Sequence, residues 1–334
     1  MAAQVTQGRS GWGRVGAIVL LLTALLSLIM VAFAWPATRS GVHDIPLAVA
    51  GPPQATSQVV RQLEAKRPGA FDVRVVGDTA AAERLIKDRE VYGAIDLTSG
   101  KPQLIVASAA SPVVAQALQQ VALALAPSQG DAAVVRDLVP LPSDDPRGAG
   151  LSAGSLPLVL GGIMAAGLLT NLVAGIWRRV AGALAFAVTG GLALVGILQY
   201  WLGSLAGDYW ANSGVVALSI AATALTLLGL ESLLGLRGLG LGAAVMMLLG
   251  NPLSGLTSAP EMLPSGWGAL GQYLPPGAAG ALLRSTAFFD GAAAAPHVLV
   301  LAVWALFGLA LVVAAAVRPR ARRAEAPASE LAAA

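Results

Sequence analysis

Six apolar stretches, each about 18 to 24 residues long, constrain this chain more than any other feature of its sequence. The first covers residues 15–35, and the other five are crowded into the second half, at residues 156–177, 180–203, 214–236, 239–256 and 297–317. Because an α-helix rises about 1.5 Å per residue, each stretch can cross a hydrocarbon layer of about 30 Å. The sequence therefore predicts a polytopic α-helical membrane protein with six transmembrane helices.

The composition supports this class and excludes several others. Hydrophobic residues make up 56% of the chain and charged residues only 12%, which is far from the balance of a soluble globular domain. The absence of cysteine excludes disulfides, cysteine-ligated zinc and thiol nucleophiles. No basic face interleaved with aromatic residues occurs, so we expect no nucleic-acid partner.

Arginines next to the apolar stretches predict the orientation. They precede the first stretch, separate the second from the third and the fourth from the fifth, and follow the sixth: Arg9, Arg14, Arg178, Arg179, Arg237, Arg318, Arg320, Arg322 and Arg323. With six crossings these positions all fall on one side, which the positive-inside rule assigns to the cytoplasm. We therefore expect a multi-pass protein of the cell membrane, in contact with membrane lipids, with both termini in the cytoplasm.

The first stretch has two interpretations. Its basic flank, its apolar core and the small residues Ala32 and Ala34 are also features of a cleavable signal peptide. The apolar core of a signal peptide has about 7 to 15 residues, and the core here is longer. The length favours a retained anchor, and the rest of the topology is the same in either case.

The segment between the first and second stretches is typical of a small α/β domain. Strands are expected at residues 45–51, 71–77, 91–97 and 103–107, and helices at 56–66, 80–89 and 112–125. Asp78 or Thr79 is the expected cap of the second helix. This order of elements predicts a mixed sheet with helices packed on it. Residues 126–155, which are rich in Pro, Gly and Ser, are expected to form a partly ordered tether.

The predicted organisation has four parts. These are a cytoplasmic N-terminus with the first transmembrane helix (1–35), an extracytoplasmic α/β domain with its tether (36–155), a bundle of five transmembrane helices (156–317) and a disordered cytoplasmic tail (318–334).

No catalytic arrangement of residues is apparent. The chain has no phosphate-binding GxxxxGK[ST] loop, no HExxH and no GxSxG. His43 and His297 are far apart in sequence, and we expect each to be an interfacial residue rather than a ligand. We therefore expect neither an enzyme nor a cofactor.

The segment between the fifth and sixth stretches predicts a re-entrant helical hairpin that caps the bundle at its outer mouth. Proline at position 252 should end the preceding helix, because it lacks the donor N–H and clashes with the previous turn. The pieces that follow are too short to span a membrane. The residues assigned to this hairpin are Asn251, Pro252, Pro264, Trp267, Pro275, Pro276, Gly277 and Arg284. An amphipathic surface loop is the alternative.

Three polar residues fall inside the predicted spans. Glu231 lies near the cytoplasmic end of the fourth span, where it can reach headgroups, pair with Arg237 or Arg178, or take a proton or substrate role. Asn171 and Gln199 are expected to form hydrogen bonds between helices. Glycines at 161–162, 190–191 and 238–242 are expected to let helices approach closely.

Two stretches of the chain resemble the permease subunits of type-two ABC exporters. They are the pattern that runs from Gly250 through Pro264, Pro275 and Pro276 to Arg284, and the strand that begins Val91-Tyr92-Gly93. The likeness is to the phage-infection-protein (Pip)-like branch, which also has one span, a large extracytoplasmic domain and five clustered spans. The resemblance implies a dimer whose spans line an export route for lipids, glycans or hydrophobic small molecules. It also implies separate cytoplasmic ATPase subunits.

One departure from that family concerns the ATPase. Such permeases usually offer a coupling helix between the second and third spans, and here that loop is only a few residues around Arg178 and Arg179. Arg178, Arg179 and Arg237 are the candidate docking residues. The alternative to an export permease is a non-transporting cell-envelope protein whose ectodomain mediates adhesion, assembly or phage attachment.

Overall fold

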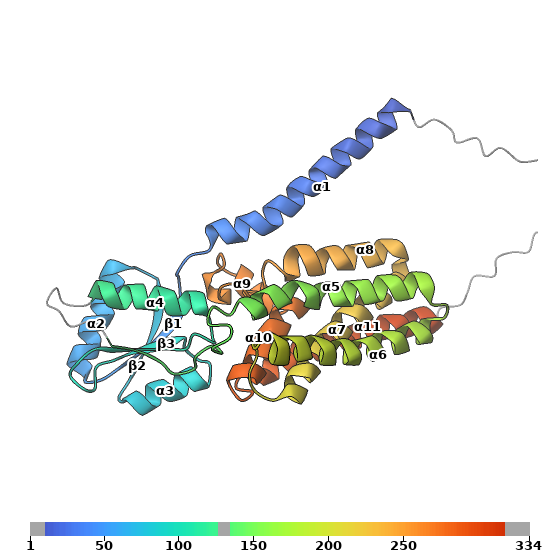
Figure 1. Ribbon diagram of the computed structural model, residues 1–334. Helices are drawn as coiled ribbons and strands as arrows, with labels where there is room; N and C mark the ends of the chain where they lie inside the picture. Colours follow the sequence, from blue (N-terminus) through green and yellow to red (C-terminus); the bar gives the residue numbers. More distant parts are fainter. Residues whose placement is uncertain (1–10, 126–133, 318–334) are drawn as a thin grey trace, which may run out of the picture.

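An α/β domain and a helical bundle meet end to end, and the first helix leans away from the bundle (Figure 1). This computed structural model describes residues 11–125 and 134–317. Arg9, the arginines that follow residue 317 and the expected tail at 318–334 lie outside the described residues.

The α/β domain contains the mixed sheet that the sequence predicts. Its strands are β1 (Ile45–Ala50), β2 (Phe71–Val76), β3 (Gly93–Asp96), β4 (Gln103–Val106) and β5 (Val134–Asp137), in the order β2-β1-β3-β4-β5. β1 runs parallel to β2 and β3, β3 is antiparallel to β4, and β4 is parallel to β5. The strand β5 is a correction, because the sequence analysis placed these residues in the tether.

Helices cover both faces of the sheet. Leu47 and Val49 of β1 pack with α2 (Pro53–Lys66) and α4 (Pro112–Leu125), whereas Ala48 and Ala50 pack with α3 (Thr79–Lys87) on the other side. This division follows from the two-residue period of a strand, which sends successive side chains to opposite faces. As predicted, Asp78 caps α3, and its carboxylate accepts the Ala81 N–H at 2.7 Å.

Five of the helices are long and apolar enough to cross a membrane, judged by length and composition within the described residues. They are α1 (Trp12–Arg39), α5 (Ala149–Leu172), α6 (Ile176–Gly196) with its π-helical continuation (Ile197–Trp201), α7 (Tyr209–Leu234) and α11 (Ala294–Val317). α5 begins inside the segment that the sequence analysis assigned to the tether. The chain is therefore a mostly helical protein with the features of a polytopic membrane protein.

The fifth apolar stretch forms a shorter helix than the sequence predicts. It consists of α8 (Leu236–Ala244) and a π-helical end (Val245–Gly250), and it stops before Asn251. The expected span at 239–256 therefore extended too far at its C-terminal end. The break falls where proline at position 252 predicts it.

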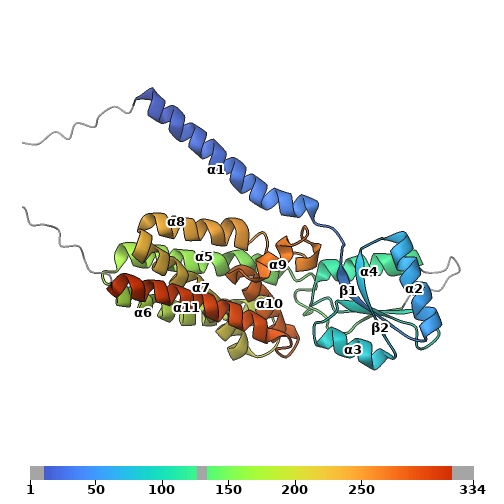
Figure 2. The same ribbon diagram turned by 180° about the vertical axis from the view of Figure 1, so that it is seen from behind.

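Helix α7 is the centre of the bundle, and most of its residues from Asn212 to Gly229 are buried. It packs against α5, α6, α8, α10 (Pro275–Phe288) and α11. Small residues allow the closest approach: a Cβ atom on Gly308 of α11 would lie 2.3 Å from the backbone of Leu225 and Thr226. Helix α1, by contrast, leaves its apolar surface uncovered and contacts the remainder only near its end, as both views show (Figure 2).

We predict that Gly308→Ala destabilises the protein by about 1 to 3 kcal/mol, because the added methyl group must push α11 away from the α7 backbone. The measurement is the free energy of unfolding in mild detergent. The matched control is Gly167→Ala on α5, where an added Cβ meets nothing within 4 Å. Equal stability of the two variants would contradict the close packing of α7 and α11.

Candidate functional site

The segment between the fifth and last apolar helices lies between the α/β domain and the bundle. It contains a 3-10 turn (Pro260–Met262), the short helix α9 (Trp267–Gln272) and α10, whose position at the domain end of the bundle is visible in both views (Figure 1, Figure 2). Met262 packs into the core beneath α2 and α4, and Phe289 packs into the core beneath α3. This segment therefore contributes to the domain core on both faces of the sheet.

Arg89 fastens the domain to α10. It follows α3 in a left-handed conformation (φ 61°), which costs a non-glycine residue about 1 to 2 kcal/mol. Its Nη1 donates to the Ala281 carbonyl at 2.7 Å and to the Ser285 hydroxyl, and its guanidinium lies 5.4 Å from the centre of the Phe289 ring. Burial lowers the pKa of the Arg89 guanidinium, and the charge of Glu261 partly offsets that effect.

Two further hydrogen bonds join the domain to this segment. The Tyr92 hydroxyl donates to Oε2 of Glu261 at 2.8 Å, and the Ser111 hydroxyl donates to the Ser258 carbonyl at 2.7 Å. Burial raises the pKa of the Tyr92 phenol, and the neighbouring Glu261 carboxylate raises it further. The phenol therefore stays a proton donor well beyond its ordinary range.

Arg284 lies on α10 and is 6% exposed. Its Nη2 donates to the Leu256 carbonyl at 2.6 Å, but its buried Nε has no hydrogen-bond partner in the described part of the chain. Gln272 is similar, because its Nε2 donates to the Ser254 carbonyl at 2.9 Å while its buried Oε1 has no partner there. Buried polar atoms without partners are rare in proteins.

These side chains line one cavity of about 430 Å³ between the domain and the bundle, which we call the junction cavity. Its wall contains Arg89, Tyr92, Glu261, Gln272 and Arg284. Residues of α9, α10 and the start of α11, of the turn before α9 and of the α/β domain make up the rest of the wall. The cavity is of a size that holds small ligands, and it combines an apolar wall with a few convergent polar groups.

His43 and His297 also line the junction cavity. The sequence analysis expected two unrelated interfacial residues, and the fold brings both to the same chamber. No group of three or more His, Cys, Asp or Glu residues that could hold a metal ion occurs among residues 11–125 and 134–317.

The residues assigned to the hairpin do not all share one environment. Asn251 and Pro252 lie beside the end of α1 around a small cavity of about 140 Å³, and Trp267 packs edge-on against Trp35 of α1 with ring centres 5.5 Å apart. Pro264 precedes α9 and is partly buried, while Pro275, Pro276 and Gly277 begin α10 and are buried. Only Arg284 of this set faces the junction cavity.

At the opposite end of the bundle, Glu231 of α7 pairs with Arg179 of α6 at 3.1 Å. Pairing with an arginine was one of the alternatives that the sequence left open for Glu231, but the partners named for it, Arg178 and Arg237, were wrong. Arg179 also donates its Nε–H to the Val173 carbonyl at 2.8 Å, so it is held inside the molecule rather than presented for docking. Arg178 and Arg237 are exposed.

Asn171 does not join two helices, contrary to expectation. It is exposed, and its amide donates to the Gly167 carbonyl one turn earlier in the same helix at 2.8 Å. Gln199 does bridge elements, because its Oε1 accepts from Asn212 of α7 at 3.2 Å. Asn212 in turn accepts from Thr286 of α10 at 2.8 Å, which links α10 to the central helix.

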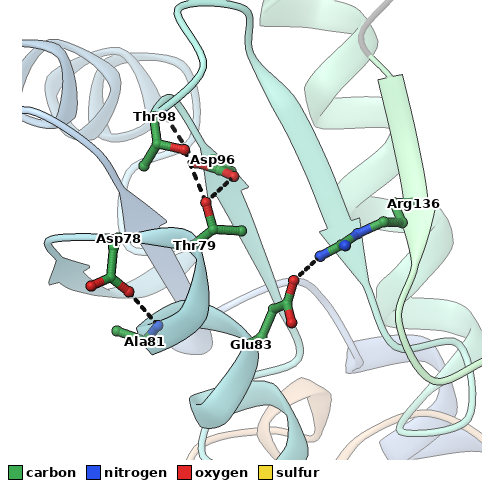
Figure 3. Close-up of polar contacts among 7 residues, drawn as sticks. All are labelled: Asp78, Thr79, Ala81, Glu83, Asp96, Thr98 and Arg136. Atoms are coloured by element: carbon green, nitrogen blue, oxygen red, sulfur yellow. Dashed lines mark hydrogen bonds and ion pairs between the residues drawn. The ribbon is translucent and has the colours of Figure 1, made fainter.

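A second polar cluster lies at the other end of the sheet, away from the bundle (Figure 3). Asp96 accepts from the Thr79 hydroxyl at 2.7 Å and from the Thr98 N–H at 2.9 Å, and Arg136 of β5 pairs with Glu83 of α3. Burial raises the pKa of Asp96, but these hydrogen bonds outweigh it, so the pKa lies below its usual value. The hydrogen-bonding capacity of the Asp96 carboxylate is thus used by its neighbours. The cluster links α3 to the strands β3 and β5.

Sequence reasoning missed Arg89, Tyr92, Glu261 and Asn212 as site residues. Arg89 was assigned to the end of a solvated helix, and Tyr92 entered only as part of a strand pattern. Their partners lie 169 to 192 residues further along the chain. Arginine at a left-handed position usually filled by glycine is the one local signal, and it is visible only once the helix end is known.

A scan against protein-family profiles finds no match for this chain, and searches of curated proteins and of solved structures find none either.

We predict that Tyr92→Phe lowers stability at neutral pH by about 1 to 2 kcal/mol, because Glu261 loses its donor. The raised pKa of Tyr92 also has a pH signature. Above about pH 10 the unfolded phenol loses its proton while the folded one keeps it, so wild-type stability falls as pH rises.

The measurement is the melting temperature from about pH 8 to about pH 11, in which Tyr92→Phe should lose less stability than the wild type. Tyr200→Phe, at a residue that is 72% exposed, is the control and should keep the wild-type melting temperature at neutral pH. Parallel alkaline losses in wild type and Tyr92→Phe would contradict a buried phenol at the junction.

Proposed function

We propose that this protein is the transmembrane subunit of an export system that moves a lipid, a glycan or a hydrophobic small molecule out of the cytoplasm. The observation that carries the proposal is the junction cavity, a partly open chamber with a few convergent polar groups between the α/β domain and the end of the helices. A domain that serves only to contact other cells or particles has no need of buried polar contacts with the bundle. Here Arg89 contributes two partly buried contacts, and Tyr92 and Ser111 contribute one each.

The proposed topology has six crossings, with the α/β domain and the junction cavity outside the cytoplasm. α7 ends at the pole of the bundle that holds the Arg179–Glu231 pair, whereas α11 begins beside the junction cavity. The chain must return between them, and the helix Leu236–Gly250 covers about 22 Å of that distance. The segment at 251–256 completes this fifth crossing, α11 makes the sixth, and α9 and α10 form the re-entrant cap.

The far pole is the proposed cytoplasmic face, where a separate ATPase would dock. Arg178 and Arg237 are exposed basic residues at this pole. Helix α1, which leaves its apolar surface uncovered, offers that surface to lipid and to a second subunit of the proposed dimer.

Two observations favour the alternative, a non-transporting envelope protein. The links between α5 and α6 and between α7 and α8 are only 173–175 and Gly235, which leaves no room for a coupling helix. A wide hollow of about 600 Å³ lies at the carboxyl ends of β1 and β2, near Gly51 and Gly77. The carboxyl ends of parallel strands are a common place for ligands, and this hollow opens away from the bundle.

The deciding experiment is purification from native membranes in mild detergent. We predict that a nucleotide-binding ATPase subunit co-purifies with the wild-type chain. Arg178→Glu combined with Arg237→Glu should reduce its recovery about tenfold or more, because reversed charges repel a partner matched to arginine.

The control reverses the same number of charges on the α/β domain, as Arg61→Glu with Arg84→Glu, and should leave recovery unchanged. Arg179 is left intact, since its ion pair with Glu231 belongs to the fold. If no ATPase is recovered with the wild type under gentle conditions, the ATP-driven export mechanism is abandoned and the envelope-protein alternative stands.

A further inference from the structure

We propose that the junction cavity is a binding site for a phosphate group, with Arg89 and Arg284 as its charge partners. This inference deepens the proposed function, because it names the chemical class of the molecule that the exporter would hold at its outer mouth. It covers a phosphate at the head of an amphiphile and a phosphate on a soluble molecule.

The charges in the cavity wall do not balance. Neither Arg89 nor Arg284 pairs with a carboxylate within 4.0 Å in the described part of the chain. The two guanidinium groups line the same chamber and repel each other. Each is therefore a cation partly removed from water with no carboxylate in direct ion-pair contact, which is a costly arrangement.

The acidic residues of the wall compensate at most one of the two charges. Glu90 pairs with Arg74, and the Asp44 side chain is 84% exposed beside His43. Glu261 accepts the hydrogen bond of Tyr92 and is the one acidic group directed to the junction. One positive charge remains uncompensated when both arginines and Glu261 are counted.

Both arginines also have N–H donors that make no hydrogen bond among the described residues. Arg89 uses only Nη1, so its Nε and Nη2 are free of hydrogen bonds among the described residues. Arg284 uses only Nη2, and its buried Nε has no partner there. Planar guanidinium groups bind phosphate oxygens through paired N–H donors, and a phosphate has enough oxygens to serve two of them at once.

The position of the cavity suits the head of a larger molecule. About 430 Å³ holds a phosphate together with a small attached group. The chamber is bounded by α9 and α10 at the end of the apolar helices, so a tail attached to the phosphate would meet the apolar surface of the bundle.

The test is the melting temperature of the purified full chain in a neutral detergent with two probes. Inorganic phosphate represents a soluble source, and dihexanoyl phosphatidic acid represents a lipid headgroup. We expect at least one probe to raise the melting temperature in a saturable way, while chloride at equal ionic strength and dihexanoylglycerol, which has the same chains but no phosphate, do not. A rise with the lipid probe alone assigns the site to a headgroup, and a rise with both assigns it to phosphate in general.

Variants locate the site. Arg284→Gln keeps a donor for the Leu256 carbonyl but removes the charge, and we expect about tenfold weaker binding or worse. Arg89→Gln should weaken it similarly, and Arg61→Gln on exposed α2 should bind as the wild type does. Arg284→Lys keeps the charge but loses the paired donors, so its affinity should lie between those of the wild type and Arg284→Gln. If both glutamine variants fail to fold, two comparisons still test the site. One compares phosphate binding by the wild type with that by Arg284→Lys, and the other compares the melting temperature of the wild type in phosphate with that in chloride.

The proposal is overturned if neither probe raises the melting temperature, or if both glutamine variants bind as the wild type does. It is also overturned if Arg61→Gln weakens binding as much as they do. Probe binding is measured without an ATPase, so an absence of probe binding leaves the export proposal standing. Loss of ATPase co-purification likewise leaves this site standing.

Discussion

Helix α7 is the element on which the rest of the structure depends, because five other helices pack against it and its two ends carry different polar groups. At one end Asn212 joins α7 to α10 through Thr286; at the other Glu231 joins it to α6 through Arg179. Between these ends the helix also carries buried Ser219, Thr223 and Thr226, and the Thr226 hydroxyl donates to the Trp304 carbonyl of α11 at 3.0 Å. A helix satisfies its own backbone hydrogen bonds, so only its polar side chains need partners, and α7 uses three of them to join α10, α6 and α11.

The polar contacts at the Asn212 end explain why the α/β domain and the bundle form one structure. α10 is bonded to α7 on one side and receives Arg89 of the domain on the other. A domain tied only by a chain segment would be free to rotate, whereas four partly buried side-chain hydrogen bonds and shared apolar cores fix it here. The junction cavity lies at this joint, so movement of α10 would change its shape.

The sequence predicts local features well and long-range pairings poorly. The cap at Asp78 and the helix break before Pro252 depend on neighbours in the chain, and both are where the patterns place them. The partner of Glu231 depends on which side of α6 faces α7. Arg178 and Arg179 are adjacent in the chain, and nothing else in the sequence shows which of them lies on that side. Arg89 could not be assigned at all, since its acceptor lies 192 residues away. The strand β5 was not predicted because it is short and follows a run of proline, glycine and serine.

The most direct test of the arrangement is labelling of single cysteines with a membrane-impermeant thiol reagent, which the cysteine-free chain allows without background. Ser99→Cys reports the α/β domain, Arg237→Cys the link after α7, and Asp290→Cys the link before α11; all three positions are exposed. We predict that Ser99→Cys and Asp290→Cys react in intact cells and that Arg237→Cys reacts only after the membrane is permeabilised. Reaction of Arg237→Cys in intact cells together with Ser99→Cys would contradict a membrane-crossing α7, and with it the outer position of the junction cavity.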